Sequence, residues 1–164
     1  MNTDMQRVNS ICSHPLWKSC VSKIRDLERE RIFCCHDTSH FLDVARIAWI
    51  ENLEKRLAIS REMIYAAAML HDIGRHLQYM QGVPHDEGSV SIASDILKDS
   101  GFDEKEQAEI LSAIRMHRNP DAASRDDLAG IICRADKKSR ICAFCSASDK
   151  CNWPESKKNM KITV

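Results

Sequence analysis

The chain has 164 residues, enough for one hydrophobic core but too few for two ordinary domains. Lysine plus arginine and aspartate plus glutamate number 24 each, so no basic surplus is available to hold an extended nucleic acid, whereas a small phosphorylated molecule is compatible with this balance. The longest apolar run, residues 63–70, is far shorter than the roughly 20 residues that span a bilayer, and the N-terminus shows no signal-peptide core. We therefore expect a cytoplasmic protein without a membrane partner.

Apolar residues recur at helical spacing along the chain, which predicts an all-α bundle of about six helices. The expected helices span approximately residues 15–31, 40–57, 60–74, 85–101, 103–119 and 124–136. Pro15 suits the first turn of the first helix, and Asp103 with Glu106 gives the capping-box pattern at the start of the fifth. Gly74 is expected to end the third helix, with a loop from there to Pro84.

Several histidines and aspartates are in phase with the apolar residues of these helices and should face the core. The in-phase residues are His40, His71, Asp72, His117 and Asp136, and His85 lies at the inward edge of its helix. An unpaired polar group in a core costs several kcal/mol, so these side chains need a partner such as a metal ion. For a single histidine, a hydrogen bond to a backbone carbonyl is the simpler explanation. Because inward-facing histidines and aspartates recur along the chain, a metal site is favoured.

The donor atoms of this set indicate which metals it suits. Four imidazoles and two carboxylates form a mixed nitrogen and oxygen set that suits Mn, Fe, Co or Zn. Six protein ligands exceed what one catalytic metal needs, so two metal ions that share Asp72 are the economical arrangement. His14 and His36 show no helical phase and are expected at the surface or as capping residues, and Gly74 leaves the register of His76 ambiguous.

The order H…HD…H…H…D, with the segments HDIGR, AIRMH and RADKKSR, resembles the HD-domain superfamily of metal-dependent phosphohydrolases over about residues 35–140. The resemblance implies an all-α helical bundle. It also implies that the core metal ligands are His40, His71, Asp72 and Asp136, and that His85 and His117 complete a second metal site. One departure is Asp43, which stands where many members have an arginine.

A two-metal site matches hydrolysis of a phosphate ester or anhydride of a small nucleotide-like substrate by an activated water molecule. Asp72 and Arg75 are the expected catalytic residues, since Arg75 is well placed to neutralise phosphoryl charge; compensation of a helix C-terminus explains Arg75 equally well. Further candidate substrate contacts are Arg118, Lys137 and Arg140. The motifs resemble those of bacterial diadenosine-tetraphosphate hydrolases, and the GYP signature of cyclic-dinucleotide phosphodiesterases is absent.

Two other activities stay open on the same ligand set. Some superfamily members with these six ligands are mixed-valent di-iron oxygenases, so the ligands do not by themselves distinguish hydrolysis from oxygen chemistry. A non-catalytic ligand sensor that has kept its metals is the third alternative.

The chain contains eight cysteines and no export signal, which predicts reduced thiols rather than a disulfide scaffold. Four of them, Cys133, Cys142, Cys145 and Cys151, could bind one structural zinc; an iron–sulfur cluster or free core thiols are the alternatives. We expect residues 1–140 to form the bundle and residues 141–164 to form a cysteine-rich extension packed on the same domain.

Overall fold

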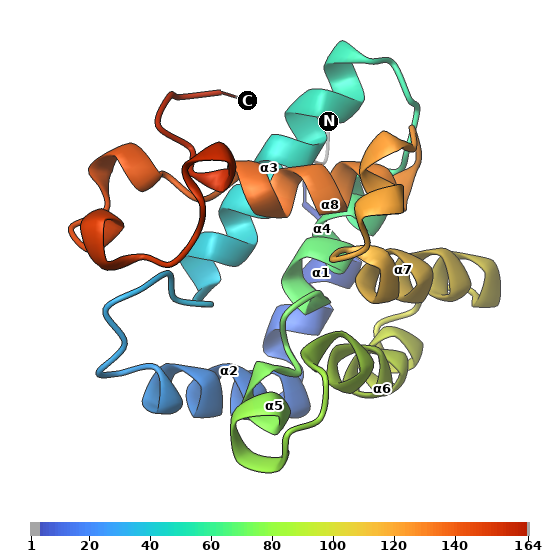
Figure 1. The fold of residues 1–164 in the computed structure, drawn as a ribbon. Helices are drawn as coiled ribbons and strands as arrows, with labels where there is room; N and C mark the ends of the chain where they lie inside the picture. The colour runs from blue at the N-terminus through green and yellow to red at the C-terminus, as the bar shows by residue number, and fades with distance from the viewer. Residues whose placement is uncertain (1–3, 164) are drawn as a thin grey trace.

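The computed structural model describes residues 4–163, which form eight α-helices and four short 3-10 helices (Figure 1). The α-helices are α1 (Gln6–Ser13), α2 (Pro15–Leu27), α3 (Thr38–Glu54), α4 (Arg61–Leu70), α5 (Arg75–Gln81), α6 (His85–Asp99), α7 (Glu104–Met116) and α8 (Leu128–Lys138). The 3-10 helices are η1 (Pro120–Ser124), η2 (Cys142–Phe144), η3 (Ser148–Lys150) and η4 (Glu155–Lys157). No strand occurs in residues 4–163, which confirms the all-α helical bundle. None of the described helices is long and apolar enough to cross a membrane.

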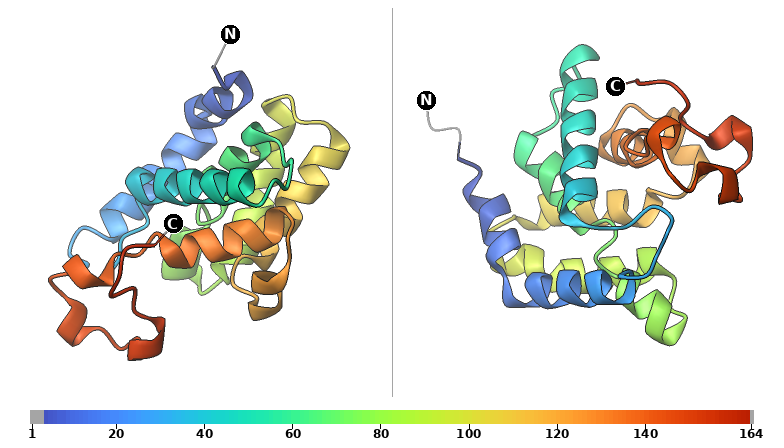
Figure 2. Two further views of the ribbon diagram at one scale, coloured as in Figure 1. Left: turned by 90° about the horizontal axis from the view of Figure 1, so that it is seen from above. Right: turned by 90° about the vertical axis from the view of Figure 1, so that its left-hand side faces the viewer.

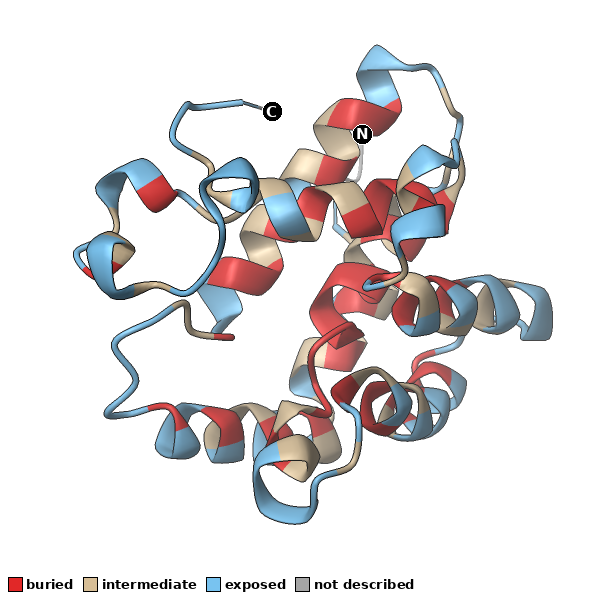
Figure 3. Ribbon diagram, in the orientation of Figure 1, coloured by how far each residue is buried: buried red, intermediate tan, exposed pale blue. Residues whose placement is uncertain are grey.

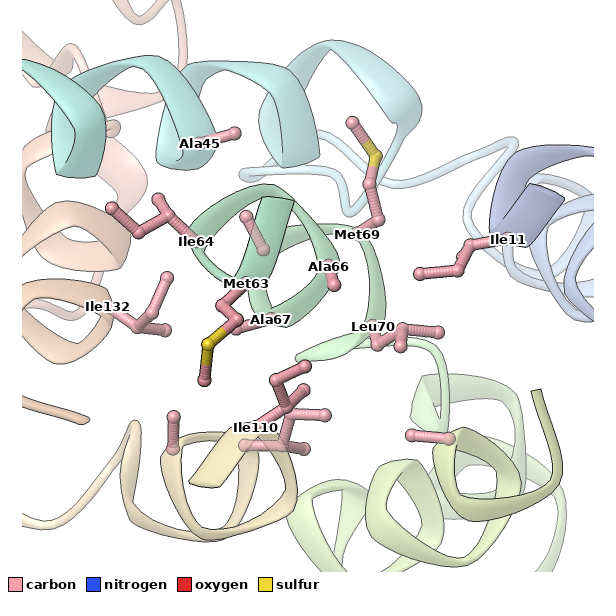
Figure 4. Packing of buried hydrophobic residues seen from close by; sticks show 14 of the residues in the cluster. Ile11, Ala45, Met63, Ile64, Ala66, Ala67, Met69, Leu70, Ile110 and Ile132 are labelled. Carbon is pink, nitrogen blue, oxygen red and sulfur yellow. The ribbon is translucent and has the colours of Figure 1, made fainter. Parts of the chain in front are cut away.

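Helix α4 lies at the centre of the hydrophobic core. It packs against α1, α3, α7 and α8, and every residue from 63 to 70 except Tyr65 is buried. Figure 4 shows α4 surrounded by buried side chains of these helices, including Ile11, Ala45, Ile110 and Ile132. The three successive alanines at 66–68 leave room for close approach of the neighbouring helices. This packing carries the residues that follow α4 into the middle of the protein.

The remaining helices lie on opposite sides of α4. Helices α3 and α8 lie side by side on one side, and α2, α5 and α6 are grouped on the other (Figures 1 and 2). The C-terminal extension, residues 141–163, leaves α8 beside the loop between α2 and α3, and most of it is exposed (Figure 3).

The expectation that one helix ends near Gly74, with a loop from there to Pro84, is wrong. Helix α4 ends at Leu70, a four-residue turn follows, and the additional helix α5 begins at Arg75. Gly74 precedes α5 with φ −84° and faces the backbone of α6. A Cβ atom on Gly74 would lie 2.3 Å from the backbone nitrogen of Ser89, so the position requires glycine for close packing rather than for ending a helix.

Other elements also differ from the expected ones. Helix α2 ends at Leu27 rather than near residue 31. Helix α8 begins at Leu128 rather than near Ser124, because the Asp127 side chain accepts a hydrogen bond from the backbone N–H of Gly130 and caps the helix there. Helix α1 was not predicted; it is short, and its eight residues bury only Val8 and Ile11. The capping box of Asp103 and Glu106 begins α7 as the sequence indicates.

Replacing Gly74 by alanine is expected to destabilise the protein by about 3 kcal/mol, because the added methyl group meets backbone atoms of α6 that have little room to move. Gly88→Ala is the matched control, since a Cβ there first meets the flexible Leu77 side chain at 3.1 Å. Urea unfolding of both variants measures the difference. Equal stabilities would contradict the close contact between Gly74 and α6.

Candidate metal centre

The six histidines and aspartates identified from the sequence converge at the ends of five helices. His40 lies in the first turn of α3, His71 and Asp72 follow α4, His85 begins α6, His117 follows α7, and Asp136 lies near the end of α8. All are buried except Asp136, whose side chain is 20% exposed. Segments far apart in the sequence therefore meet at one buried polar cluster.

Asp72 divides this cluster into two groups, each with atoms close enough to hold a metal ion. One group contains His40, His71, Asp72 and Asp136, and the other contains Asp72, His85 and His117. Asp72 Oδ2 lies 3.6 Å from His40 Nε2 and 3.2 Å from His71 Nε2. Its other oxygen, Oδ1, lies 3.2 Å from His85 Nε2 and 3.6 Å from His117 Nε2. The two oxygens of one carboxylate thus face different groups.

Each of the four imidazoles is oriented by a contact at Nδ1 that leaves Nε2 pointing into the cluster. His71 Nδ1 lies 2.7 Å from the carbonyl oxygen of Ala68, and His117 Nδ1 lies 2.6 Å from that of Ile114. These carbonyls belong to the last turns of α4 and α7, which lack helical partners, so each histidine also caps its helix. The other two contacts join His85 Nδ1 to Gln78 Oε1 at 2.7 Å and His40 Nδ1 to Ser139 Oγ at 3.2 Å. Donation from Nδ1 leaves the Nε2 lone pair for a metal.

Three polar atoms that face the middle of the cluster have no hydrogen-bond partner within residues 4–163. Among the described residues, His71 Nε2, Asp72 Oδ1 and Asp136 Oδ1 are buried without a hydrogen-bond partner. His85 Nε2 lies 3.3 Å from His117 Nε2, so two lone pairs face each other when both rings donate from Nδ1. Lone pairs and carboxylates at these distances repel unless a cation lies between them. The donor set therefore fits divalent transition metals, as nitrogen and oxygen ligands do.

The pKa values of the histidines and aspartates in the cluster indicate an excess of negative charge. Burial alone would lower the pKa of His71, but the carboxylates of Asp72 and Asp136 raise it to about 10. Burial would raise the pKa of both carboxyl groups, but the surrounding imidazoles hold both well below the usual range. Burial lowers the pKa of His85 to about 3, so that ring is neutral. Without a metal, a proton on His71 provides the positive charge that the two carboxylates require.

Two guanidinium groups border the cluster. Arg75 Nε lies 3.5 Å from Asp72 Oδ1, and Arg140 Nη2 lies 3.2 Å from His40 Nε2. Burial lowers the pKa of His36, and the charges of both arginines lower it further. Arg75 is the first residue of α5, where a cation is disfavoured by the helix dipole, so compensation of a helix C-terminus does not explain it.

The other two predicted substrate contacts lie further out. Arg118 is exposed and close enough to contribute to the lowered pKa of His85. Lys137 is also exposed, and its Nζ donates to Cys133 Sγ at 3.6 Å.

His36 was expected at the surface or as a capping residue, and this expectation is wrong. Its side chain is 3% exposed, and Nε2 lies 3.8 Å from Asp72 Oδ2. Glu28 binds both the backbone N–H and Nδ1 of His36, and it also accepts a hydrogen bond from Tyr79 at 2.6 Å. Burial would raise the pKa of Glu28, but these partners lower it to about 2. His36 lies in a non-helical loop, so no periodicity could have revealed its burial.

The two remaining histidines, His14 and His76, lie outside the cluster. His14 is the N-cap of α2 and accepts from the backbone N–H of Leu16, as expected of a capping residue. His76 is buried, with Nδ1 3.2 Å from the carbonyl oxygen of Ile73.

The structure places Cys34, rather than Cys133, with the cysteines of the extension. Cys133 Sγ lies 3.6 Å from the carbonyl oxygen of Asn119 and accepts from Lys137. A small cavity between the α2–α3 loop and the extension is lined by Cys34, Cys142, Cys145 and Cys151. Cys34 belongs to the same non-helical loop as His36, which explains why spacing did not group it with the others.

Comparison with known proteins confirms the resemblance noted in the sequence. The HD domain family matches residues 38–141. A protein of Clostridium beijerinckii, called only an uncharacterized protein, is 41% identical over 158 residues, covering 96% of this chain and 99% of the relative. The crystal structure of a predicted HD superfamily hydrolase from an uncultured Thermotogales bacterium matches with a TM-score of 0.64 and 26% identity, covering 88% of this chain and 80% of that chain.

Metal binding to the metal-free protein is expected to release about one proton near neutral pH, because the pKa of His71 is raised to about 10 and its proton must leave before Nε2 can bind a metal. The apparent affinity for manganese or zinc should therefore rise as pH is raised from neutral toward that value. Calorimetric titration in buffers with different ionisation enthalpies measures the proton release. A binding enthalpy independent of the buffer, with an affinity that does not rise with pH, would contradict the protonated state of His71.

Proposed function

The chain belongs to the HD domain family, and on that premise we propose that it is a metal-dependent phosphohydrolase that cleaves a phosphate ester or anhydride of a small nucleotide-like substrate. The observation that carries this proposal is the position of Asp72, whose two oxygens face separate groups of ligand atoms. A carboxylate placed in this way can bridge two metal ions. The solved HD superfamily structure, itself described as a predicted hydrolase, supports the same class of reaction.

The proposal assigns the metal ligands in two sets that share Asp72. His40, His71, Asp72 and Asp136 would hold one divalent ion, and Asp72, His85 and His117 would hold a second. When bound, such ions supply an activated water molecule and neutralise charge on a phosphoryl group. The nitrogen and oxygen donors favour Mn, Fe, Co or Zn.

The chain itself supplies cations for the phosphoryl oxygens. Arg75 Nε is buried without a hydrogen-bond partner among the described residues, and its Nη1 donates to Gln78 Oε1 at 3.4 Å. The Arg140 side chain is positioned by a different contact, because its Nη1 donates to the carbonyl oxygen of Cys35 at 3.1 Å. Guanidinium groups form strong charge-assisted hydrogen bonds with phosphate, so these two arginines are the proposed substrate contacts. Metal binding at His40 Nε2 would also free the Arg140 donor that now occupies that lone pair.

The exposure of the site favours a small substrate. The side chains of Asp136, Arg75 and Arg140 are 20%, 21% and 11% exposed, while the histidines are almost fully buried. A phosphoryl group can therefore reach the cluster at the edge formed by these residues. The equal numbers of acidic and basic residues offer no basic excess for a longer polyanion.

The manganese-loaded protein is expected to hydrolyse members of a panel of nucleotides and dinucleoside polyphosphates, releasing inorganic phosphate from the former and nucleotides from the latter. Asp72→Ala should lower this activity by at least about 100-fold and reduce the bound metal, since it removes the shared ligand. Asp95→Ala, an exposed carboxylate on α6, is the matched control and should retain both. Full metal occupancy without turnover on any substrate would favour the sensor, and dioxygen-dependent turnover by iron-loaded protein would favour the oxygenase.

Arg75→Ala is expected to lower kcat/KM by about 100-fold with the metal content unchanged, because it removes a donor to the phosphoryl oxygens and no metal ligand. Arg75→Lys should recover only part of the loss, since lysine lacks the planar pair of donors. Arg46→Ala, an exposed arginine on α3, is the control. Steady-state kinetics with metal analysis tests this role, and unchanged kinetics in Arg75→Ala would exclude it.

A further inference from the structure

Four cysteines from separate segments line one small cavity at the edge of the protein. Cys34 comes from the loop between α2 and α3, Cys142 begins η2 and Cys145 follows it, and Cys151 follows η3. The cavity measures about 20 Å³, room for roughly one water-sized occupant. We propose that these four thiolates bind one zinc ion, which fastens the C-terminal extension to the α2–α3 loop.

The extension has little apolar material with which to hold its shape. It contains only 3-10 helices of three residues each, and among its hydrophobic residues only Cys142 and Ala147 are buried. Its large apolar side chains, Ile141, Phe144, Trp153, Met160 and Ile162, are 37% to 79% exposed. A segment of this size without its own core usually depends on a disulfide or a metal for its stability. All eight cysteines are free thiols, so a metal is the cross-link that fits.

The residue types and backbone turns at the cavity suit a structural zinc site. Cys142 and Cys145 have the C-x-x-C spacing of a zinc knuckle, and the Cys145 N–H donates to the Cys142 carbonyl oxygen at 3.1 Å in a tight turn. The same kind of turn precedes Cys151, whose N–H donates to the Ser148 carbonyl oxygen at 3.2 Å. The cavity is also lined by Lys158, whose Nζ pairs with Glu155 Oε1 at 2.6 Å and donates to the Ser148 carbonyl oxygen at 3.1 Å.

Zinc binding requires movement of the four sulfurs. Among the described residues, no three of these Sγ atoms lie within 4.8 Å of one another, so they do not yet form a single ligand sphere. A cysteine has one side-chain torsion, and rotation between its staggered positions moves the sulfur by about 3 Å. We therefore expect the four side chains to rotate toward the shared cavity when zinc binds.

This cross-link would also act on the proposed substrate edge. Cys34 precedes Cys35, whose carbonyl oxygen accepts from Arg140, and His36, which faces Asp72. On the other side of the cavity, Asn159 Nδ2 donates to the carbonyl oxygens of Lys137 and Arg140 at 2.6 Å each. Fixing the loop against the extension would hold Arg140 at two points, its guanidinium through the Cys35 carbonyl and its own carbonyl through Asn159.

The test compares Cys34→Ser with Cys133→Ser in the full chain purified under reducing conditions. Elemental analysis should find about one zinc fewer per chain in Cys34→Ser and no loss in Cys133→Ser. Cobalt substitution separates this site from the histidine cluster, because thiolate ligands give an intense sulfur-to-cobalt charge-transfer band that nitrogen and oxygen ligands lack. Cys34→Ser should lose this band, and Cys34→His should regain metal, since zinc accepts three cysteines and one histidine.

Control measurements separate loss of the site from loss of the fold. Circular dichroism and manganese binding at the histidine cluster should be retained by Cys34→Ser, while limited proteolysis should cut its extension faster. The proposal is overturned if Cys133→Ser loses the metal and Cys34→Ser keeps it, if the cobalt protein shows no thiolate band, or if the cysteines hold an iron–sulfur chromophore or form disulfides.

Discussion

The burial of one carboxylate, that of Asp72, is the constraint on which the rest of the structure depends. Four imidazole Nε2 atoms lie 3.2 to 3.6 Å from its two oxygens, and the side chain has almost no access to water. A buried charge at this depth is very unfavourable unless cations accompany it. When no metal is bound, a proton on His71 provides positive charge beside Oδ2, and the Arg75 guanidinium lies 3.5 Å from Oδ1.

Helix termini, rather than helix faces, deliver the ligands to that carboxylate. The last-turn carbonyls of α4 and α7 hold the Nδ1 atoms of His71 and His117, which satisfies the helix ends and fixes the rings with one bond each. The close approach of Gly74 to α6 brings the start of that helix, and with it His85, beside Asp72. The alanines of α4 allow the surrounding helices to meet at this depth. Backbone packing thus determines the ligand geometry.

Helical periodicity could predict the parts of the protein in which a repeating face is buried. It located the segments of α3, α4, α6, α7 and α8 and the inward position of the six ligand residues. It placed His71 and Asp72 on a helix, although they lie in the turn that continues inward from α4. It could not find His36 or Cys34, because both lie in a loop whose position depends on Glu28 and on the extension rather than on a repeating pattern. Contacts between distant irregular segments leave no local pattern in the sequence.

The loop between α2 and α3 and the C-terminal extension both contact Arg140. Under the proposed function, both segments therefore help to position this substrate contact. The loop at 28–37 presents His36 to Asp72 and the Cys35 carbonyl to Arg140, while Asn159 of the extension binds the backbone on either side of Ser139. Ser139 in turn orients His40. The helical core supplies most of the proposed metal ligands independently of these segments, whereas the placement of Arg140 depends on both. Changes in the loop or the extension should therefore alter substrate binding before they alter metal binding.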